Sequence, residues 1–325
     1  MKSAKTFLIG LAIALCWAAG CAGTENRVAD ENGDGTDGDT DGDTDGDTDG
    51  DADGDADTDT ESDSDPWCPN IDILFVIDNS GSMTDNQDSI IASFPGFVEA
   101  IQSQLLYAPT VHVGVVVPGF SFMNPQGCRD IGHLVTETTG AINSSNEVCT
   151  PFASGGSYLN MDEPNLAEKF ACIAKVGGGG ADDERPMRAI LNALSAEWNA
   201  EGECNEGFHR EDSVLVIVIV TDEDDVEQGC DQWGCDSYGS GGTPEEWSET
   251  VISYKNGHSE NVIVLSVIGL ELDNDCGAVP AANLIAFTND FENSYKGDVC
   301  ADSYEDFFAE ALPMITQACK EWEVE

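Results

Sequence analysis

The stretch IDILFVIDNSGSM, residues 71–83, decides the fold prediction for this chain. Its first part is a run of apolar residues interrupted by one acid, and its second part places Asp78, Ser80 and Ser82 in one short turn. A run of this kind is typical of a strand in a sheet that is covered on both faces. The stretch therefore predicts a buried strand over 71–78 that ends in one carboxylate and two hydroxyl groups.

Strand and helix patterns alternate along the rest of the chain. We expect strands over 111–117, 213–222 and 261–269, a weaker strand over 131–137, helices over 84–105, 165–176 and 303–319, and another helix that begins near Pro186. This alternation predicts an α/β fold with a doubly wound, mostly parallel sheet and helices on both faces, similar to a Rossmann fold. Such sheets bind ligands beyond the carboxyl ends of their strands.

Three local features refine this prediction. Pro95-Gly96 should break or offset the first helix, because proline removes a backbone donor and clashes with the preceding turn. Residues 138–162 have little periodicity and should form a long loop. Asp182 or Asp183 is expected to cap the helix that begins near Pro186.

The charge of the chain is strongly negative, with a net charge of −51 at pH 7. Residues 30–65 hold 18 acidic side chains and no basic one, whereas residues 66–325 hold 44 acidic and nine basic ones. Nucleic acids and anionic membrane surfaces are therefore poor partners for this chain. Residues 21–66 cannot form a core and should be a disordered acidic linker, which leaves 67–325 as the folded domain.

The N-terminus is typical of an export signal. Lys2 and Lys5 precede an apolar run over 7–17, and small residues lie directly before Cys21. This end resembles a bacterial lipoprotein signal peptide over 1–20, which implies that Cys21 carries a lipid. We expect a protein anchored in the cell envelope, at the outer membrane or cell surface. An ordinary signal peptide that is cleaved nearby is the alternative.

Ten cysteines follow the signal region, and an even number in an exported chain predicts disulfides. Their spacing lacks the paired motifs of a zinc site. Cys68 and Cys319 bracket the folded part and are candidates to tie its ends together. The disulfide candidates are Cys68, Cys128, Cys149, Cys172, Cys204, Cys230, Cys235, Cys276, Cys300 and Cys319.

The polar residues after two of the most apolar strands form a candidate cation site. Asp78, Ser80 and Ser82 follow the first strand, and Asp222 ends the apolar stretch 213–222. Carboxylate and hydroxyl oxygens suit a divalent cation such as Mg²⁺. Because so few carboxylates leave the cation partly unneutralised, its open position would favour an acidic group from a partner.

The motif Asp-x-Ser-x-Ser after a buried strand resembles the von Willebrand factor type A domain and its metal-ion-dependent adhesion site, over roughly residues 68–320. The resemblance implies that Ser80 and Ser82 bind the metal through their hydroxyl groups and that Asp78 supports it directly or through water. It also implies that Asp222 supplies the later aspartate.

One part of the chain departs from this family. Its glycine-rich loop usually carries a threonine, but here it reads VGGGGADDERPM, residues 176–187. Glu184 is the best substitute, with Asp182 and Asp183 behind it. A further carboxylate would neutralise the metal better and could favour Ca²⁺ or Mn²⁺.

Each candidate residue has a simpler structural alternative. Ser80 and Ser82 could cap the following helix. Asp222 could belong to a solvated acidic loop, and Glu184 could be a first-turn acid that interacts with the helix dipole.

The leading functional hypothesis is a lipid-anchored envelope protein that binds a protein ligand through one divalent cation. An acidic structural protein that gathers calcium without a defined partner is the second. A metal-dependent hydrolase is the third, but Ser80 stands where a phosphatase of the haloacid dehalogenase type needs a second aspartate. We therefore expect no enzymatic activity.

Overall fold

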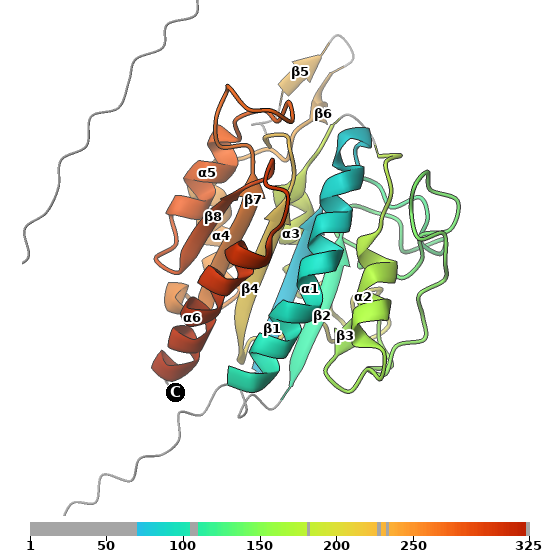
Figure 1. Ribbon diagram of the computed structural model, residues 1–325, viewed down its shortest axis with the longest axis vertical. Helices are drawn as coiled ribbons and strands as arrows, with labels where there is room; N and C mark the ends of the chain where they lie inside the picture. The colour runs from blue at the N-terminus through green and yellow to red at the C-terminus, as the bar shows by residue number, and fades with distance from the viewer. Residues whose placement is uncertain (1–69, 105–109, 181–182, 226–228, 232–233, 323–325) are drawn as a thin grey trace, which may run out of the picture. The chain divides into compact units, whose positions relative to one another are not determined.

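The computed structural model describes residues 70–104, 110–180, 183–225, 229–231 and 234–322 (Figure 1). These residues all belong to one compact unit that spans Glu61–Glu325. The predicted signal peptide, Cys21, the acidic linker and Cys68 lie outside the described residues. A search of the described helices finds none that has both the length and the apolar character to span a membrane.

A six-stranded sheet forms the centre of the described unit, in the order β3-β2-β1-β4-β7-β8. All neighbouring strands are parallel except the edge strand β3, which runs antiparallel to β2. The strands of this sheet are β1 (Asn70–Ile77), β2 (Val111–Val116), β3 (Leu159–Asn160), β4 (Ser213–Val220), β7 (Val262–Ile268) and β8 (Ser294–Asp298). A separate antiparallel pair consists of β5 (Gly229–Asp231) and β6 (Gly234–Tyr238). The predicted α/β fold with a mostly parallel sheet is confirmed.

Helices and short 3₁₀ turns connect the strands. The helices are α1 (Thr84–Gln104), α2 (Leu166–Ala174), α3 (Pro186–Leu194), α4 (Pro244–Ser253), α5 (Ala282–Asn289) and α6 (Glu305–Glu321), and the 3₁₀ turns are η1 (Gly81–Met83) and η2 (Ser259–Asn261).

Two hydrophobic clusters lie on opposite faces of the sheet because successive strand residues point to opposite sides. Ile73 and Phe75 face a cluster that includes residues of α1, α2 and α6. Leu74 and Val76 face a cluster that includes residues of α3, α4 and α5. In Figure 1, α1 and α6 accordingly lie in front of the sheet and α4 behind it. The continuous apolar strands predicted from the sequence are thus buried on both sides.

The weak strand predicted over 131–137 is wrong. Leu134 and Val135 are buried, but side chains satisfy much of the local backbone. Asn205 Oδ1 accepts a hydrogen bond from Leu134 N at 2.9 Å, and Asn124 Oδ1 accepts one from Thr136 N at 3.0 Å. Val135 N donates to the carbonyl of Val115 in β2 at 2.8 Å, but the described residues form no strand there, and β3 pairs with β2 instead.

The predicted break at Pro95-Gly96 is also wrong, because α1 continues through both residues. Pro95 and Gly96 lie on the exposed face, whereas Phe94, Phe97 and Val98 are buried in the core. Burial of large apolar side chains contributes about 1.5–3 kcal/mol each. Three of them outweigh the cost of about 3 kcal/mol that a proline imposes on a helix interior.

The predicted aspartate cap of α3 is not present among the described residues. Arg185 occupies the N-cap position of α3 and makes no side-chain capping bond. Asp183 instead accepts a hydrogen bond from Gly239 N at 2.8 Å and pairs with Arg185. Asp182 lies outside the described residues.

Three disulfides are described, and each pairs cysteines that are distant in sequence: Cys128–Cys204, Cys149–Cys172 and Cys276–Cys300. Cys319 is also disulfide-bonded. The side chains of Cys230 and Cys235 lie outside what the structure describes. The predicted disulfide character is confirmed for the pairs that the structure describes.

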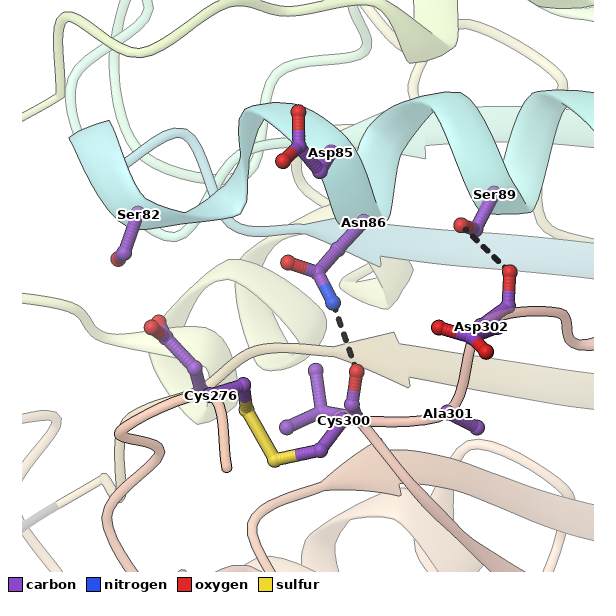
Figure 2. A pocket seen from close by; sticks show the side chains of 10 residues that line it. Ser82, Asp85, Asn86, Ser89, Cys276, Cys300, Ala301 and Asp302 are labelled. Carbon is purple, nitrogen blue, oxygen red and sulfur yellow. Dashed lines mark hydrogen bonds between the residues drawn. A yellow bond between two sulfur atoms is a disulfide. The ribbon is translucent and has the colours of Figure 1, made fainter. Parts of the chain in front are cut away.

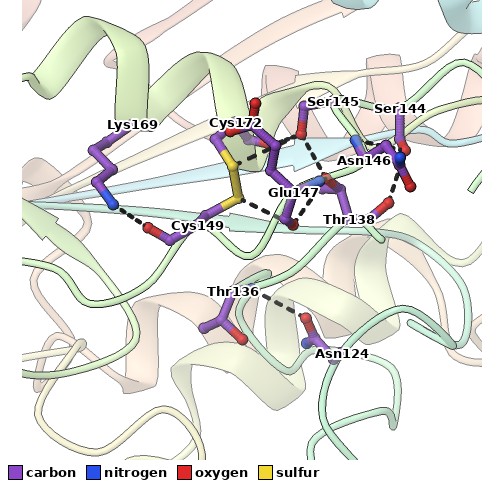
Figure 3. The surroundings of a disulfide bond; sticks show 10 residues. All are labelled: Asn124, Thr136, Thr138, Ser144, Ser145, Asn146, Glu147, Cys149, Lys169 and Cys172. Carbon is purple, nitrogen blue, oxygen red and sulfur yellow. Dashed lines mark hydrogen bonds between the residues drawn. A yellow bond between two sulfur atoms is a disulfide. The ribbon is translucent and has the colours of Figure 1, made fainter. Parts of the chain in front are cut away.

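The long loop predicted over 138–162 is largely irregular and is tied to α2 by the Cys149–Cys172 disulfide (Figure 3). Ser145 Oγ donates a hydrogen bond to the carbonyl of Cys172 at 2.9 Å, and Lys169 Nζ donates to the carbonyl of Cys149. These contacts anchor α2, whose carboxyl end leads into the glycine-rich loop of the candidate site.

Candidate functional site

The candidate site lies where the chain changes direction within the sheet. After β1 the chain adds β2 on one side, and β4 then pairs with the other side of β1. Ligands of open α/β sheets bind at such a switch point, outside the carboxyl ends of the strands. Asp78 follows β1, Asp222 follows β4, and Asp78 N donates to the carbonyl of Val220 at 3.0 Å. The structure therefore brings the ends of these two strands together, as the sequence predicted.

Asp78 is fully buried, and hydrogen bonds hold both of its carboxylate oxygens. Ser80 N donates to Oδ1 at 2.6 Å, and Thr221 Oγ1 donates to Oδ2 at 2.6 Å. Burial raises the pKa of Asp78 to about 6, Asp222 adds to this rise, and the hydrogen bonds from Thr221 and Ser80 oppose it. The carboxyl group is consequently fixed in position at the end of β1.

The two serines present their hydroxyl groups to each other. Ser80 Oγ and Ser82 Oγ are 3.0 Å apart. This separation is close to the roughly 3 Å expected between neighbouring oxygen ligands of an octahedral cation with bonds of about 2.1 Å. Ser80 precedes η1, but its side chain makes no capping hydrogen bond. The capping alternative therefore does not describe what the Ser80 hydroxyl does.

Glu184 is buried, and no hydrogen bond to its carboxylate comes from the described residues. It is 4% exposed, and neither Oε1 nor Oε2 makes a hydrogen bond with a residue that the structure describes. Burial raises its pKa to about 10, and acidic neighbours, led by Asp78 and including Asp222, contribute to this rise. Asp222 Oδ1 is likewise buried and has no hydrogen-bond partner within the described part of the chain. The site thus contains carboxylate oxygens that nothing on the described chain neutralises through a hydrogen bond.

The glycine-rich loop packs tightly against the turn after β1. Gly180 N donates to the carbonyl of Asn79 at 2.7 Å. A Cβ atom on Gly180 would lie 2.5 Å from Asn79 Oδ1, and one on Gly178 would lie 3.2 Å from Gly81 Cα. Side chains larger than hydrogen would therefore separate this loop from the serine turn.

Sequence reasoning missed two residues that position Asp78. Thr221 orients the carboxylate, and its place directly before Asp222 was the signal that could have revealed it.

Gln87 is fully buried and donates from Nε2 to the carbonyls of Asp78, at 2.9 Å, and Gly177, at 2.8 Å. Gly177 N donates back to Gln87 Oε1 at 2.9 Å, so that one side chain links β1 to the glycine-rich loop. The sequence offers no signal for Gln87, because it is one polar residue among several in the first helix.

The donor set fits a divalent cation, although the described residues contain no ready-made group of three or more acidic, histidine or cysteine side chains for a metal. The three predicted carboxylate ligands, Asp78, Asp222 and Glu184, therefore do not form such a group among the described residues. The unpartnered buried oxygens of Glu184 and Asp222 are the structural feature that agrees with a cation. Ligation by Asp78, Ser80, Ser82, Asp222 and Glu184 stays a prediction.

A polar cavity of about 500 Å³ adjoins the site and shares Ser82 and Asp222 with it (Figure 2). Asp85 at the start of α1 and Asp302 after β8 contribute further carboxylates to its wall, and the Cys276–Cys300 disulfide forms another part. Ser82 and Asp222 therefore border the same polar cavity as Asp85 and Asp302.

Comparisons with known proteins do not assign a family. No family model matches the chain, and no curated protein matches it. Proximal thread matrix protein 1 from the mussel byssus has a TM-score of 0.38 at 14% identity, over 78% of this chain and 49% of that chain. The pilus adhesin SpaC from Lactobacillus rhamnosus GG has a TM-score of 0.40 at 15% identity, over 77% of this chain and 30% of that chain. The pilus adhesin RrgA from Streptococcus pneumoniae has a TM-score of 0.31 at 10% identity, over 76% of this chain and 44% of that chain. The chain spans half or less of the length of these proteins, and similarity at this level assigns no function.

Proposed function

We propose that this chain is a surface adhesion protein that binds a protein partner through one divalent cation at the carboxyl edge of its sheet. The observation that carries the proposal is the set of buried carboxylate oxygens on Glu184 and Asp222, near Asp78, that have no hydrogen-bond partner among the residues the structure describes. A buried charge without a partner is costly, and a bound cation offsets that cost. The hydroxyl pair of Ser80 and Ser82 completes an all-oxygen donor set.

The fold supports this proposal in its finer form, a doubly wound domain of the von Willebrand factor type A kind. The two central strands β1 and β4 carry the candidate ligands at neighbouring ends, and helices pack against both faces of the sheet. When bound, the cation supplies a Lewis acid that attracts an oxygen group of the partner. Thr221 and the backbone of Ser80 hold the Asp78 carboxylate in place for that purpose.

Exposed apolar side chains beside the site favour a protein as the partner. Phe122 is 40% exposed, and a Cβ atom on Gly179 would lie 3.6 Å from its ring. Val279 is 53% exposed, and its backbone N donates to the carbonyl of Asp222 at 2.8 Å. Large apolar side chains around a polar centre are a common feature of protein interfaces.

The cellular setting of the proposal rests on the sequence. Export, attachment of a lipid at Cys21 and display on the cell envelope are the setting that we propose, in which the domain would meet other surfaces. Within this proposal the protein has no enzymatic activity.

Titration calorimetry of Mg²⁺ and Ca²⁺ into the full chain tests the cation site. We expect one site per chain that is much tighter than the weak binding of the linker, and we expect Asp78→Ala to abolish it. Asp306→Ala is the matched control, because it removes an exposed carboxylate from the start of α6. Many weak, equivalent sites that persist in Asp78→Ala would instead support the calcium-gathering alternative.

A further inference from the structure

The Cys276–Cys300 disulfide is more accessible to solvent than the other two described disulfides. Cys276 is exposed, whereas the other cysteines of the three described disulfides are half-buried or buried. The bond also forms part of the wall of the cavity that adjoins the candidate site (Figure 2). Thiol–disulfide exchange requires access to one of the two sulfur atoms, and exposed disulfides are the labile and regulatory ones in proteins. This bond is therefore open to attack by a thiolate from solvent.

Cys276 lies in the loop 269–281 between β7 and α5, and hydrogen bonds within this loop organise its tip. Asn274 Nδ2 donates to the carbonyls of Glu271 at 2.7 Å and Ala278 at 2.8 Å. Asn274 Oδ1 accepts a hydrogen bond from Ala278 N at 3.1 Å. These bonds shape the tip but do not attach it to the rest of the domain.

Besides the disulfide, backbone hydrogen bonds hold the loop at its base. Ala281 N donates to the carbonyl of Gly269 at 2.9 Å, and Val279 N donates to the carbonyl of Asp222 at 2.8 Å. Apolar burial adds little at the tip, where Leu272 is 89% exposed. No hydrogen bond between described residues joins the loop to the segment that follows β8, and the disulfide supplies that link.

The segment that follows β8 is fixed independently of the disulfide. Asn86 Nδ2 in α1 donates to the carbonyl of Val299 at 2.7 Å, and Val299 N donates to the carbonyl of Ile268 at 3.1 Å. Cleavage of the bond between the sulfur atoms therefore leaves Cys300 in place and frees the loop that carries Cys276.

We propose that Cys276–Cys300 is a thiol–disulfide exchange site, which an external dithiol reduces while the other two described disulfides stay intact, and that its reduction releases the loop 269–281 from the cavity wall. Because Val279 of this loop contacts the carbonyl of Asp222, the redox state of the disulfide controls one edge of the candidate site. This inference goes beyond the proposed function and does not require a bound cation.

The exchange follows the usual two steps of thiol–disulfide chemistry. A thiolate of the dithiol attacks the exposed Cys276 Sγ, the bond between the sulfur atoms breaks, and Cys300 leaves as a thiolate. The second thiol of the reductant then attacks its own sulfur in the mixed disulfide, which closes the oxidised reductant and releases Cys276 as a thiolate. Two electrons pass from the dithiol to the disulfide, and the two protons of the dithiol end on Cys276 and Cys300.

Reduction of the folded full chain with increasing concentrations of dithiothreitol, followed by alkylation with iodoacetamide and peptide mapping, tests the exchange site. Dithiothreitol is a suitable dithiol because it is uncharged, whereas the carboxylates of Asp85, Asp222 and Asp302 in the cavity wall would repel an anionic one. Cys276 and Cys300 should be labelled at a concentration at least tenfold lower than the cysteines of the other two described disulfides. Simultaneous labelling of all three pairs, or earlier labelling of another of these pairs, would overturn the proposal.

Hydrogen–deuterium exchange tests the release of the loop. Selective reduction should speed exchange within 269–281 at least tenfold and leave β1 and β4 unchanged. Cys276→Ser/Cys300→Ser should show the same increase without reductant, and Cys128→Ser/Cys204→Ser is the matched control, in which this loop should exchange as in the wild type. Unchanged exchange of the loop in the selectively reduced wild type overturns the proposal. The reduced wild type decides the matter if a variant fails to fold, as judged by circular dichroism.

Discussion

Replacement of Glu184 by glutamine should stabilise the domain when EDTA is present. Gln has nearly the same shape, and the carboxylate oxygens that it replaces make no hydrogen bond. The wild type must either ionise a buried carboxyl group or bind a proton to it on folding, whereas glutamine needs neither. The variant therefore loses no interaction in the absence of cations and avoids an electrostatic cost.

The size of this effect follows from the raised pKa of Glu184, which moves from its ordinary value of 4.5 to about 10. A carboxyl group whose pKa is higher in the folded state does not lower the free energy of unfolding at pH values below its pKa in the unfolded state. It lowers the free energy of unfolding progressively as the pH rises from the unfolded-state pKa towards the folded-state pKa. At pH 7 the group is protonated in the folded state and ionised in the unfolded state, so folding must bind a proton. With an ordinary pKa of 4.5, binding this proton at pH 7 lowers the free energy of unfolding by about 3 kcal/mol. Near pH 5 the cost falls below about 1 kcal/mol.

Equilibrium urea unfolding in EDTA, with disulfides intact, measures this difference. Glu184→Gln should exceed the wild type by about 3 kcal/mol at pH 7 and by much less at pH 5, while the exposed-acid variant Glu245→Gln should differ by under about 0.5 kcal/mol. Saturating Ca²⁺ should narrow this difference, since 100 times the Kd adds about 2.7 kcal/mol to a protein that binds it. Equal or lower stability of Glu184→Gln at pH 7 in EDTA would refute the reasoning.

Two further substitutions test the geometry of the site. Gly180→Ala should weaken cation binding at least tenfold in calorimetry, because its Cβ would lie 2.5 Å from Asn79 Oδ1. Gly179→Ala is the control and should bind the cation normally, because the nearest neighbour of its Cβ would be 3.6 Å away. Equal affinities of the two variants would show that the tight contact is not required. Thr221→Val removes the 2.6 Å hydrogen bond to Asp78 and should lower the free energy of unfolding by about 1–2 kcal/mol and the cation affinity several-fold. An unchanged free energy of unfolding together with an unchanged cation affinity would mean that Thr221 does not orient the carboxylate.

Local patterns explain why much of the fold was predictable. A strand that is covered on both faces removes the apolar runs at 71–77 and 213–220 from water, and both runs form central strands here. The edges of the sheet were less predictable. The weak pattern over 131–137 failed because side chains from distant loops satisfy its backbone, and β8 escaped prediction because its residues are only partly buried.

The amino-acid sequence by itself determined the apolar strands, the mostly parallel sheet and the neighbouring placement of Asp78 and Asp222, because side-chain burial and strand direction follow from local order along the chain. Only the tertiary structure decided which side chains form hydrogen bonds with one another and which are buried. Thr221 and Gln87 reach Asp78 through contacts between distant segments, and the burial of Glu184 without a partner depends on how the glycine-rich loop packs against the turn after β1. Hydrogen bonding and burial depend on distances in space, and spacing along the chain does not contain them.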